Sequence, residues 1–259
     1  MDYSREYIKK ARQILDTVEE QIPVIKEVAS LFANSILKGR MVHLFGSGHS
    51  RIMVEEMWPR YGSFPGFNPI VELSLTFHNT VTGANGQRQA MFLENVPGFA
   101  TRILRNFDVQ KDDCALVISS SGSNIVPIEI AEEFQKMDVK VVALVSKDHA
   151  FGSSSKRADG KKLMDFADYI LDTRAPLGDA MIKINRLDTP VSPGSTLGGV
   201  AVINSIKAEV ASLLMENGKT PKVLSSGKLV GEERAIELFE SAYDEHAHLI
   251  SKLYQDVGK

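Results

Sequence analysis

Residues 41–50 read MVHLFGSGHS, a short apolar run that ends in glycine and serine. Residues 114–124 read CALVISSSGSN and repeat that arrangement. The apolar part of each run is continuous rather than alternating, which is typical of strands covered on both faces. In each case a polar loop follows the strand and opens a helical stretch. This order of elements indicates a parallel sheet whose strands are joined through helices.

Three further apolar runs fit the same interpretation. We expect the remaining strands at 69–73, 140–145 and 169–172. Helical stretches lie between most of the five strands, at 50–58, 88–106 and 123–136. Strands that alternate with helices predict a three-layer α/β/α sandwich around a five-stranded parallel sheet.

The segments on either side of this core read as helices. Residues 3–38 have apolar positions at helical spacing in two runs, and Pro23 lies where it suits the first turn of the second helix. After the fifth strand we expect a small extra strand at 181–184, an apolar helix over about 200–216 and a last helix over about 231–255. We therefore predict one α/β domain over 1–259, with a helical preface (1–40), a core (41–220) and a helical tail (221–259).

The composition excludes several classes of protein. The chain of 259 residues carries 30 Lys and Arg against 33 Asp and Glu, so bulk charge does not drive binding to a polyanion. A single cysteine provides no disulfide framework and favours a reducing compartment. The N-terminus is charged, and no run of about 18 apolar residues is present. We expect a cytoplasmic protein that binds neither nucleic acid nor a membrane.

The two glycine- and serine-rich loops carry the chemistry. In a parallel α/β sheet, ligands bind outside the carboxyl ends of the strands, where both loops lie. Glycines permit close approach of the backbone, and hydroxyls with the free N–H groups of a helix start suit a phosphate. The expected phosphate- and sugar-binding residues are Gly46, Ser47, Gly48, His49, Ser50, Ser119, Ser120, Ser121, Gly122 and Ser123. Either loop alone could be only a cap or a turn, but two on strand ends favour a binding site.

Other ligands fit these loops less well. Residues 46–51 match the first two glycines of a dinucleotide fingerprint, but Arg51 stands where close helix packing needs the third glycine. His246 and His248 are two residues apart, a spacing that does not place them on one face of a helix, so no metal site is expected. We therefore predict no cofactor and no metal.

With these motifs, residues 5–220 resemble the sugar isomerase (SIS) domain of phosphosugar-binding proteins, and most closely SIS proteins related to phosphoheptose isomerases. The resemblance implies a five-stranded, flavodoxin-like fold, a homodimer or homotetramer, and sites at subunit interfaces. It also implies that Ser47, Ser50, Ser119, Ser121 and Ser123 bind a sugar phosphate, with Ser120 beside them. Residues 195–199, before the long apolar helix, are similar to the closing element of the family.

The resemblance is weaker where catalysis is concerned. Phosphoheptose isomerases place a carboxylate ten residues after the first-loop serine, where this chain has Arg60. Their acid/base histidine lies on the late apolar helix, and residues 200–216 contain no histidine.

Other acids and bases are available in the sequence. Aldose–ketose isomerisation needs a base near carbon and an acid near oxygen. Glu55 and Glu56 lie on the helix that begins at the first loop, and His78 follows the second strand on the ligand side. These three are the candidate catalytic residues. The alternative for Glu56 is a surface ion pair with Arg60. Glu94 is a further candidate, because its segment resembles one that carries a carboxylate in ether-cleaving SIS enzymes.

The sequence thus predicts a phosphosugar-binding protein that acts as an aldose–ketose isomerase. Two alternatives remain open. One is a lyase that cleaves a sugar ether through the same enolising chemistry, and the other is a sugar-phosphate sensor without catalysis.

Overall fold

The computed structural model describes residues 2–76, 86–255 and 257, and it confirms the five-stranded parallel sheet. The strands are β1 (Val42–Gly46), β2 (Phe67–Ile70), β3 (Cys114–Ile118), β4 (Lys140–Val145) and β5 (Tyr169–Asp172). They lie in the order β2-β1-β3-β4-β5, and each adjacent pair is parallel. The order reverses between β1 and β3, and such a switch point is where open α/β sheets bind ligands.

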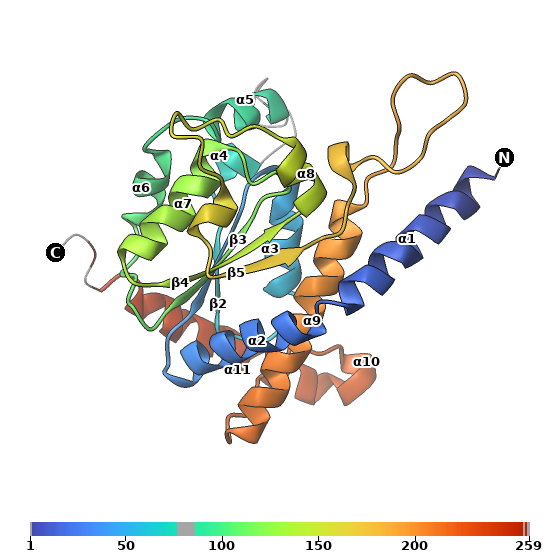
Figure 1. The fold of residues 1–259 in the computed structure, drawn as a ribbon. Coiled ribbons are helices and arrows are strands. Elements are labelled where there is room, and N and C mark those ends of the chain that lie inside the picture. The colour runs from blue at the N-terminus through green and yellow to red at the C-terminus, as the bar shows by residue number, and fades with distance from the viewer. Residues whose placement is uncertain (1, 77–85, 256, 258–259) are drawn as a thin grey trace.

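Helices cover both faces of the sheet, which confirms the three-layer sandwich (Figure 1). One face carries α1 (Tyr3–Glu19), α2 (Ile22–Leu37), α3 (Arg51–Met57) and α9 (Ser195–Glu216). The opposite face carries α6 (Phe99–Leu104) and α7 (Ile125–Lys136). Successive side chains of β3 divide between the two cores, with Leu116 in the first and Val117 in the second. This alternation explains why the strands are apolar throughout.

Among the described residues, the helix α9 is long and apolar enough to cross a membrane by length and composition alone. Its buried side chains instead pack in the first core, where the helix contacts α2 and α3. It begins at Ser195, earlier than the expected residue 200, and ends at Glu216 as expected. The helix is therefore a core element that the composition alone does not distinguish from a membrane span.

The second strand and the helix that follows it differ from the prediction. β2 begins at Phe67 rather than at residue 69, because pairing starts where Val42 N donates to Gly66 O at 2.9 Å. It tolerates Pro69 because it is an edge strand. The chain then leaves the sheet and forms α4 (Leu73–Thr76). The expected strand at 69–73 was therefore misplaced at both ends.

The expected single helix over 88–106 is two helices. α5 (Gly86–Leu93) and α6 are separated by a turn in which Gly98 adopts φ 78°. Two hydrogen bonds fasten this turn to α7: Val126 N donates to Glu94 O at 2.9 Å, and Gly98 N donates to Glu129 Oε2 at 2.8 Å. The break fixes the position of Glu94, which lies in this turn.

The segment between β5 and α9 forms an arm. The expected strand at 181–184 is reduced to one antiparallel bridge between Ile182 and Val191. From this bridge the hairpin projects away from the body, beside the N-terminal end of α1 (Figure 1). Asn185 N donates to the Tyr3 hydroxyl at 3.2 Å, which ties the arm to that helix. The chain ends with α10 (Gly227–Val230) and α11 (Glu232–Lys252).

Candidate functional site

The two serine-rich loops meet at one cavity of about 350 Å³ at the carboxyl ends of β1 and β3. Of the residues expected to bind phosphate and sugar, the following line it: Ser47, Gly48, His49, Ser50, Ser119, Ser120 and Ser121. The other three lie within the same loops: Gly46 ends β1, and Gly122 and Ser123 precede α7. The fold thus brings together loops that are about 70 residues apart in the sequence.

Glycine is required in the first loop for steric reasons. A Cβ on Gly46 would lie 2.8 Å from the carbonyl carbon and oxygen of Ser50, closer than a side chain tolerates. Gly48 has φ 57° and opens a short 3-10 turn, η1 (Gly48–Ser50), which leads into α3. Ser47 is buried, and its hydroxyl donates to Glu94 Oε2 at 2.9 Å. The loop therefore places a hydroxyl and a carboxylate side by side at the cavity.

Three carbonyl groups of the second loop accept hydrogen bonds from residues that do not line the cavity. Ser120 O accepts from Ser146 N at 2.9 Å, Gly122 O from Leu163 N at 2.8 Å, and Ser123 O from Lys156 N at 2.9 Å. Its own hydroxyls are linked, since Ser123 Oγ donates to Ser121 Oγ at 2.8 Å.

The backbone amides of the second loop include several that have no hydrogen-bond partner among the described residues. The backbone N–H groups of Ser120, Ser121 and Asn124 donate to no acceptor in the part of the chain that the structure describes. All three residues line the cavity. Amide donors without acceptors, next to hydroxyls and the start of α7, form an arrangement that suits an anion.

Asp179, which the sequence analysis missed, orders the far wall of the cavity. It ends a short 3-10 turn, η4 (Leu177–Asp179), with φ 50°. Its carboxylate accepts from Gly194 N at 3.0 Å, from Ser195 N at 2.8 Å and from the Ser195 hydroxyl at 2.5 Å. This bonding caps the start of α9 and places Ser195 and Thr196 at the cavity. Only the tertiary structure shows the contact, because 15 residues separate Asp179 from Gly194.

Two titratable side chains complete the lining. Glu94, a lesser candidate in the sequence, reaches the cavity from the turn after α5. His149 lies in the first turn of α8 (Lys147–Gly152) with Nδ1 3.4 Å from Ser120 Oγ. The described lining includes no Lys or Arg, and its titratable side chains are Glu94, Asp179, His49 and His149.

Glu55 and Glu56 do not line this cavity in the described structure. The Glu55 side chain is half exposed and lies 3.5 Å from Arg51 Nε. Glu56 turns toward α9, where Asn204 Nδ2 donates to its Oε1 at 2.7 Å, and it also pairs with Arg60. Burial alone would raise the pKa of Glu56, but the hydrogen bonds from Asn204 and Arg60 lower it below its ordinary value. The third candidate, His78, lies outside the described residues.

Lys207 holds the end of α3 near this ion pair. Its buried ammonium donates to Glu56 O at 2.7 Å and to Ser63 Oγ at 3.1 Å. Desolvation by burial lowers the pKa of Lys207 below its ordinary value, although Glu56 opposes the change. A cation at the C-terminus of a helix is stabilising, so Lys207 fixes the helix that begins at the first loop.

Comparison with known proteins agrees with the fold. Residues 6–146 match the family model of the SIS domain. The chain is 33% identical over 254 residues to a UPF0309 protein of Thermoanaerobacter pseudethanolicus, covering 96% of this chain and 99% of that protein. It is 29% identical over 245 residues to a UPF0309 protein of Listeria innocua, covering 94% and 97%.

Among solved structures, a phosphoheptose isomerase from Francisella tularensis has the same fold. The two structures superpose with a TM-score of 0.53 at 15% identity, covering 81% of this chain and 96% of that one. An α/β sandwich with two serine loops at its switch point is the arrangement of a sugar-isomerase-type domain. The chain belongs to the SIS domain family and, within it, to the UPF0309 proteins.

Proposed function

We propose that this protein binds a phosphorylated sugar in the cavity between its two serine loops and isomerises it between aldose and ketose. The observation that carries the proposal is the set of unpaired amides at Ser120, Ser121 and Asn124, beside the Ser119 and Ser121 hydroxyls. These donors face one place at the start of α7, where the helix dipole favours negative charge. The phosphate group binds there, and the sugar extends toward Ser47 and Glu94.

Glu94 is the base that this geometry favours. Its carboxylate is at the cavity, Oε2 accepts from Ser47 Oγ, and no described residue donates to Oε1, which is therefore available to substrate. In the isomerisation, Glu94 takes the proton from the carbon next to the carbonyl and returns it to the former carbonyl carbon. Proton transfer between the two oxygens completes the reaction, and His49 or His149 is placed to carry it. The substrate and product are isomers, so no redox partner enters.

Glu55 and Glu56 are the alternative bases. Either would have to leave its present partners, since Glu56 is held by Asn204 and Arg60. Their distance from the lining also supports the second candidate function, a sensor that binds sugar phosphate without chemistry. A lyase that eliminates a sugar ether would use the same enolising base.

The test begins with a panel of aldose and ketose phosphates in a thermal-shift assay, because a ligand that binds only the native state raises the apparent stability. Each stabilising compound is then incubated with the protein in D₂O and followed by NMR and mass. Isomerisation exchanges a carbon-bound proton for deuterium and leaves the carbon skeleton of the sugar intact. A lyase splits the substrate into two smaller products. Stabilisation without exchange or cleavage supports the sensor. No stabilisation by any member of the panel contradicts the proposal.

We also propose a cellular location and an oligomeric state for the protein. A reducing cytoplasm suits the single buried Cys114, and the balanced net charge suits a small-molecule substrate rather than nucleic acid or a membrane. A homodimer or homotetramer is the proposed assembly.

A further inference from the structure

The segment 153–163 packs against the second serine loop and donates hydrogen bonds to two of its carbonyl groups. Two of the three carbonyl bonds described above come from this segment: Lys156 N donates to Ser123 O, and Leu163 N donates to Gly122 O. A Cβ on Gly122, which has φ 58°, would lie 3.3 Å from Leu163 Cβ, so the two chains are in close contact. Because carbonyl oxygens repel an anion, bonds that hold them outward keep the amides of the loop directed at the cavity.

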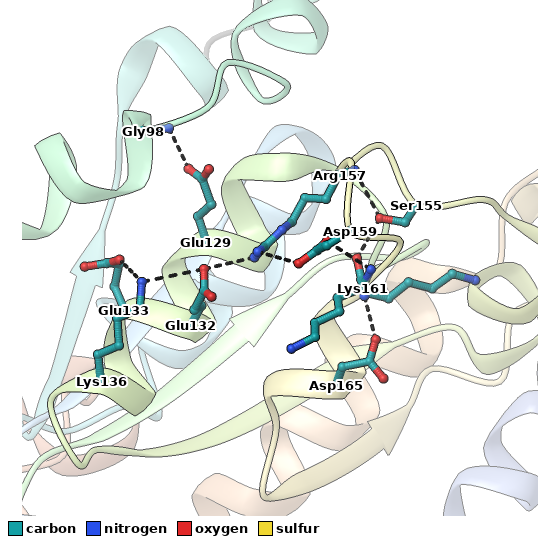
Figure 2. Close-up of polar contacts among 11 residues, drawn as sticks. Gly98, Glu129, Glu132, Glu133, Lys136, Ser155, Arg157, Asp159, Lys161 and Asp165 are labelled. Atoms are coloured by element: carbon teal, nitrogen blue, oxygen red, sulfur yellow. Dashed lines mark hydrogen bonds and ion pairs between the residues drawn. The ribbon is translucent and has the colours of Figure 1, made fainter.

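Arg157 anchors this segment next to the residue that donates to Ser123. Figure 2 shows its guanidinium between two carboxylates: Nη1 donates to Glu132 Oε2 at 3.0 Å and Nη2 to Asp159 Oδ2 at 2.8 Å. The same group lies 5.2 Å from the centre of the Phe166 ring. Only 16% of the Arg157 side chain is exposed. A planar cation with two carboxylates and a ring is a fixed contact, unlike an exposed ion pair.

The contact joins the two structural supports of the serine loop. Glu132 belongs to α7, the helix that begins directly after the loop, and Asp159 belongs to the segment behind it. Phe166 lies in the second core, in the 3-10 turn η3 (Leu163–Phe166). Arg157 therefore sets the distance between α7 and the segment whose amides hold the loop carbonyls. It does not line the cavity itself.

We propose that Arg157 is a positioning residue for the phosphate site, acting through the backbone of Gly122 and Ser123. The inference rests on the proposed function, since it concerns anion binding at that loop. Without Arg157 the segment separates from α7, the carbonyl bonds of Lys156 and Leu163 weaken, and the amides of the loop lose their common direction. Affinity for phosphate falls although no ligand contact has been removed.

The experiment compares Arg157→Met, Arg157→Lys and Lys136→Met. Lys136 provides the matched control, because it pairs with Glu133 and Glu132 in the same cluster, carries the same charge and is largely exposed. Inorganic phosphate and the tightest sugar phosphate of the panel are titrated by calorimetry, at a temperature where circular dichroism shows every variant folded. R157M is expected to bind about three- to tenfold more weakly, R157K less so, and K136M within about twofold of the parent.

Hydrogen exchange separates positioning from mere stabilisation. The Lys156 and Leu163 amides are expected to exchange faster in R157M, and phosphate is expected to slow them in the parent protein more than in R157M. By linkage, a ligand protects the bonds that its own binding requires. A purely structural role for Arg157 would lower the melting temperature without changing this ligand-dependent protection.

Failure of the two proposals is distinguishable. If the parent protein binds neither phosphate nor any sugar phosphate, the proposed function fails and this inference fails with it. If the parent binds and Ser121→Ala weakens binding, but R157M binds as K136M does, only the role of Arg157 is overturned. If R157M does not fold, R157K provides the test. A phosphate affinity of R157K equal to that of K136M contradicts the positioning role, whereas an affinity more than twofold below that of the parent supports it.

Discussion

At the scale of single residues, the cavity depends on a few hydroxyl and amide donors of the second serine loop. Ser121 is the clearest of them. Its hydroxyl accepts from Ser123 Oγ at 2.8 Å, and its amide has no acceptor among the described residues. Its own hydroxyl hydrogen remains available to a ligand in the cavity that it lines.

Ser121→Ala is therefore expected to weaken the binding of a sugar phosphate by about 1–2 kcal/mol, the range for a hydrogen bond to a charged partner. Folding stability should change little. Calorimetric titration measures the effect, and Ser154→Ala, at an exposed serine in the segment behind the loop, is the control. Unchanged affinity in both Ser121→Ala and Ser50→Ala contradicts the assignment of the phosphate to these loops.

The choice of base is the second question at this scale. Glu94→Gln keeps the size of the side chain and its contact with Ser47, but it removes the basic oxygen. The rate of proton exchange is expected to fall about a hundredfold or more, the range for loss of a general base, with little loss of binding. Exchange is followed by NMR in D₂O with the substrate that the panel identifies.

Glu55→Gln is the matched control, because Glu55 is half exposed and away from the cavity. If Glu55→Gln or Glu56→Gln abolishes exchange while Glu94→Gln does not, the base is on α3.

At the scale of elements, the ends of the strands are fixed by a buried charged cluster. Asp113, directly before β3, accepts from Arg40 Nη2 at 2.7 Å and lies 3.3 Å from His43 Nε2. It also accepts from Met41 N at 3.2 Å, which links the starts of β1 and β3. Burial would raise the pKa of Asp113, but the nearby His43 ring and the hydrogen bonds from Arg40 lower it from 3.8 to about 2.

This shift predicts a loss of stability in acid. A carboxylate whose folded pKa is depressed stabilises the fold above its unfolded pKa, and the contribution disappears as pH falls through the folded value. As pH falls from about 5 to about 2, protonation of Asp113 is expected to lower the free energy of unfolding by about 2 kcal/mol. Urea unfolding across this range measures the slope.

Asp113→Asn should flatten that slope, whereas Asp16→Asn, at an exposed position on α1, should leave it unchanged. A slope equal in the parent and in Asp113→Asn would show that another group dominates the acid transition.

At the scale of the whole molecule, exposed apolar side chains lie on three short helical segments that also contribute residues to the polar cavity. Met91 and Phe92 of α5 are 54% and 71% exposed, and Phe151 and Leu177 are 72% and 59% exposed. Met91 lines the cavity. Phe151 lies two residues after His149, and Leu177 lies two residues before Asp179. Exposed apolar groups around a site usually mark an interface. The core takes up most of the apolar surface of α9, so the association that we expect depends on α5 more than on that helix.

We therefore expect a dimer or tetramer at low micromolar concentration, with the cavity near the interface, measured by light scattering. Phe92→Asp is expected to lower the mass and to weaken sugar-phosphate binding. Leu229→Asp, at an exposed position on α10, is the control and should change neither. A parent protein of monomer mass with full sugar-phosphate binding would exclude a shared pocket.

Local features of the chain were sufficient to predict the sheet and its two loops. Continuous apolar runs specify strands covered on both faces, and β3, β4 and β5 begin and end where their runs do. Gly46 and the serines that follow each strand are likewise short-range signals, since a turn and a helix start depend on neighbouring residues. The placement of Ser47 and Ser119 to Ser121 at one cavity then follows from parallel pairing of the strands.

Contacts between distant segments were decided only in the tertiary structure. Four such contacts join separate elements. Asp179 caps α9, and the backbone of Glu94 bonds to α7. Glu56 bonds to Asn204, and Arg157 bonds to Glu132. No periodicity encodes such a pair, because each side chain has several possible partners of suitable charge, and packing of the helices selects among them. The sequence by itself therefore determined the architecture and the two serine-rich loops, whereas the tertiary structure decided which carboxylate faces the cavity.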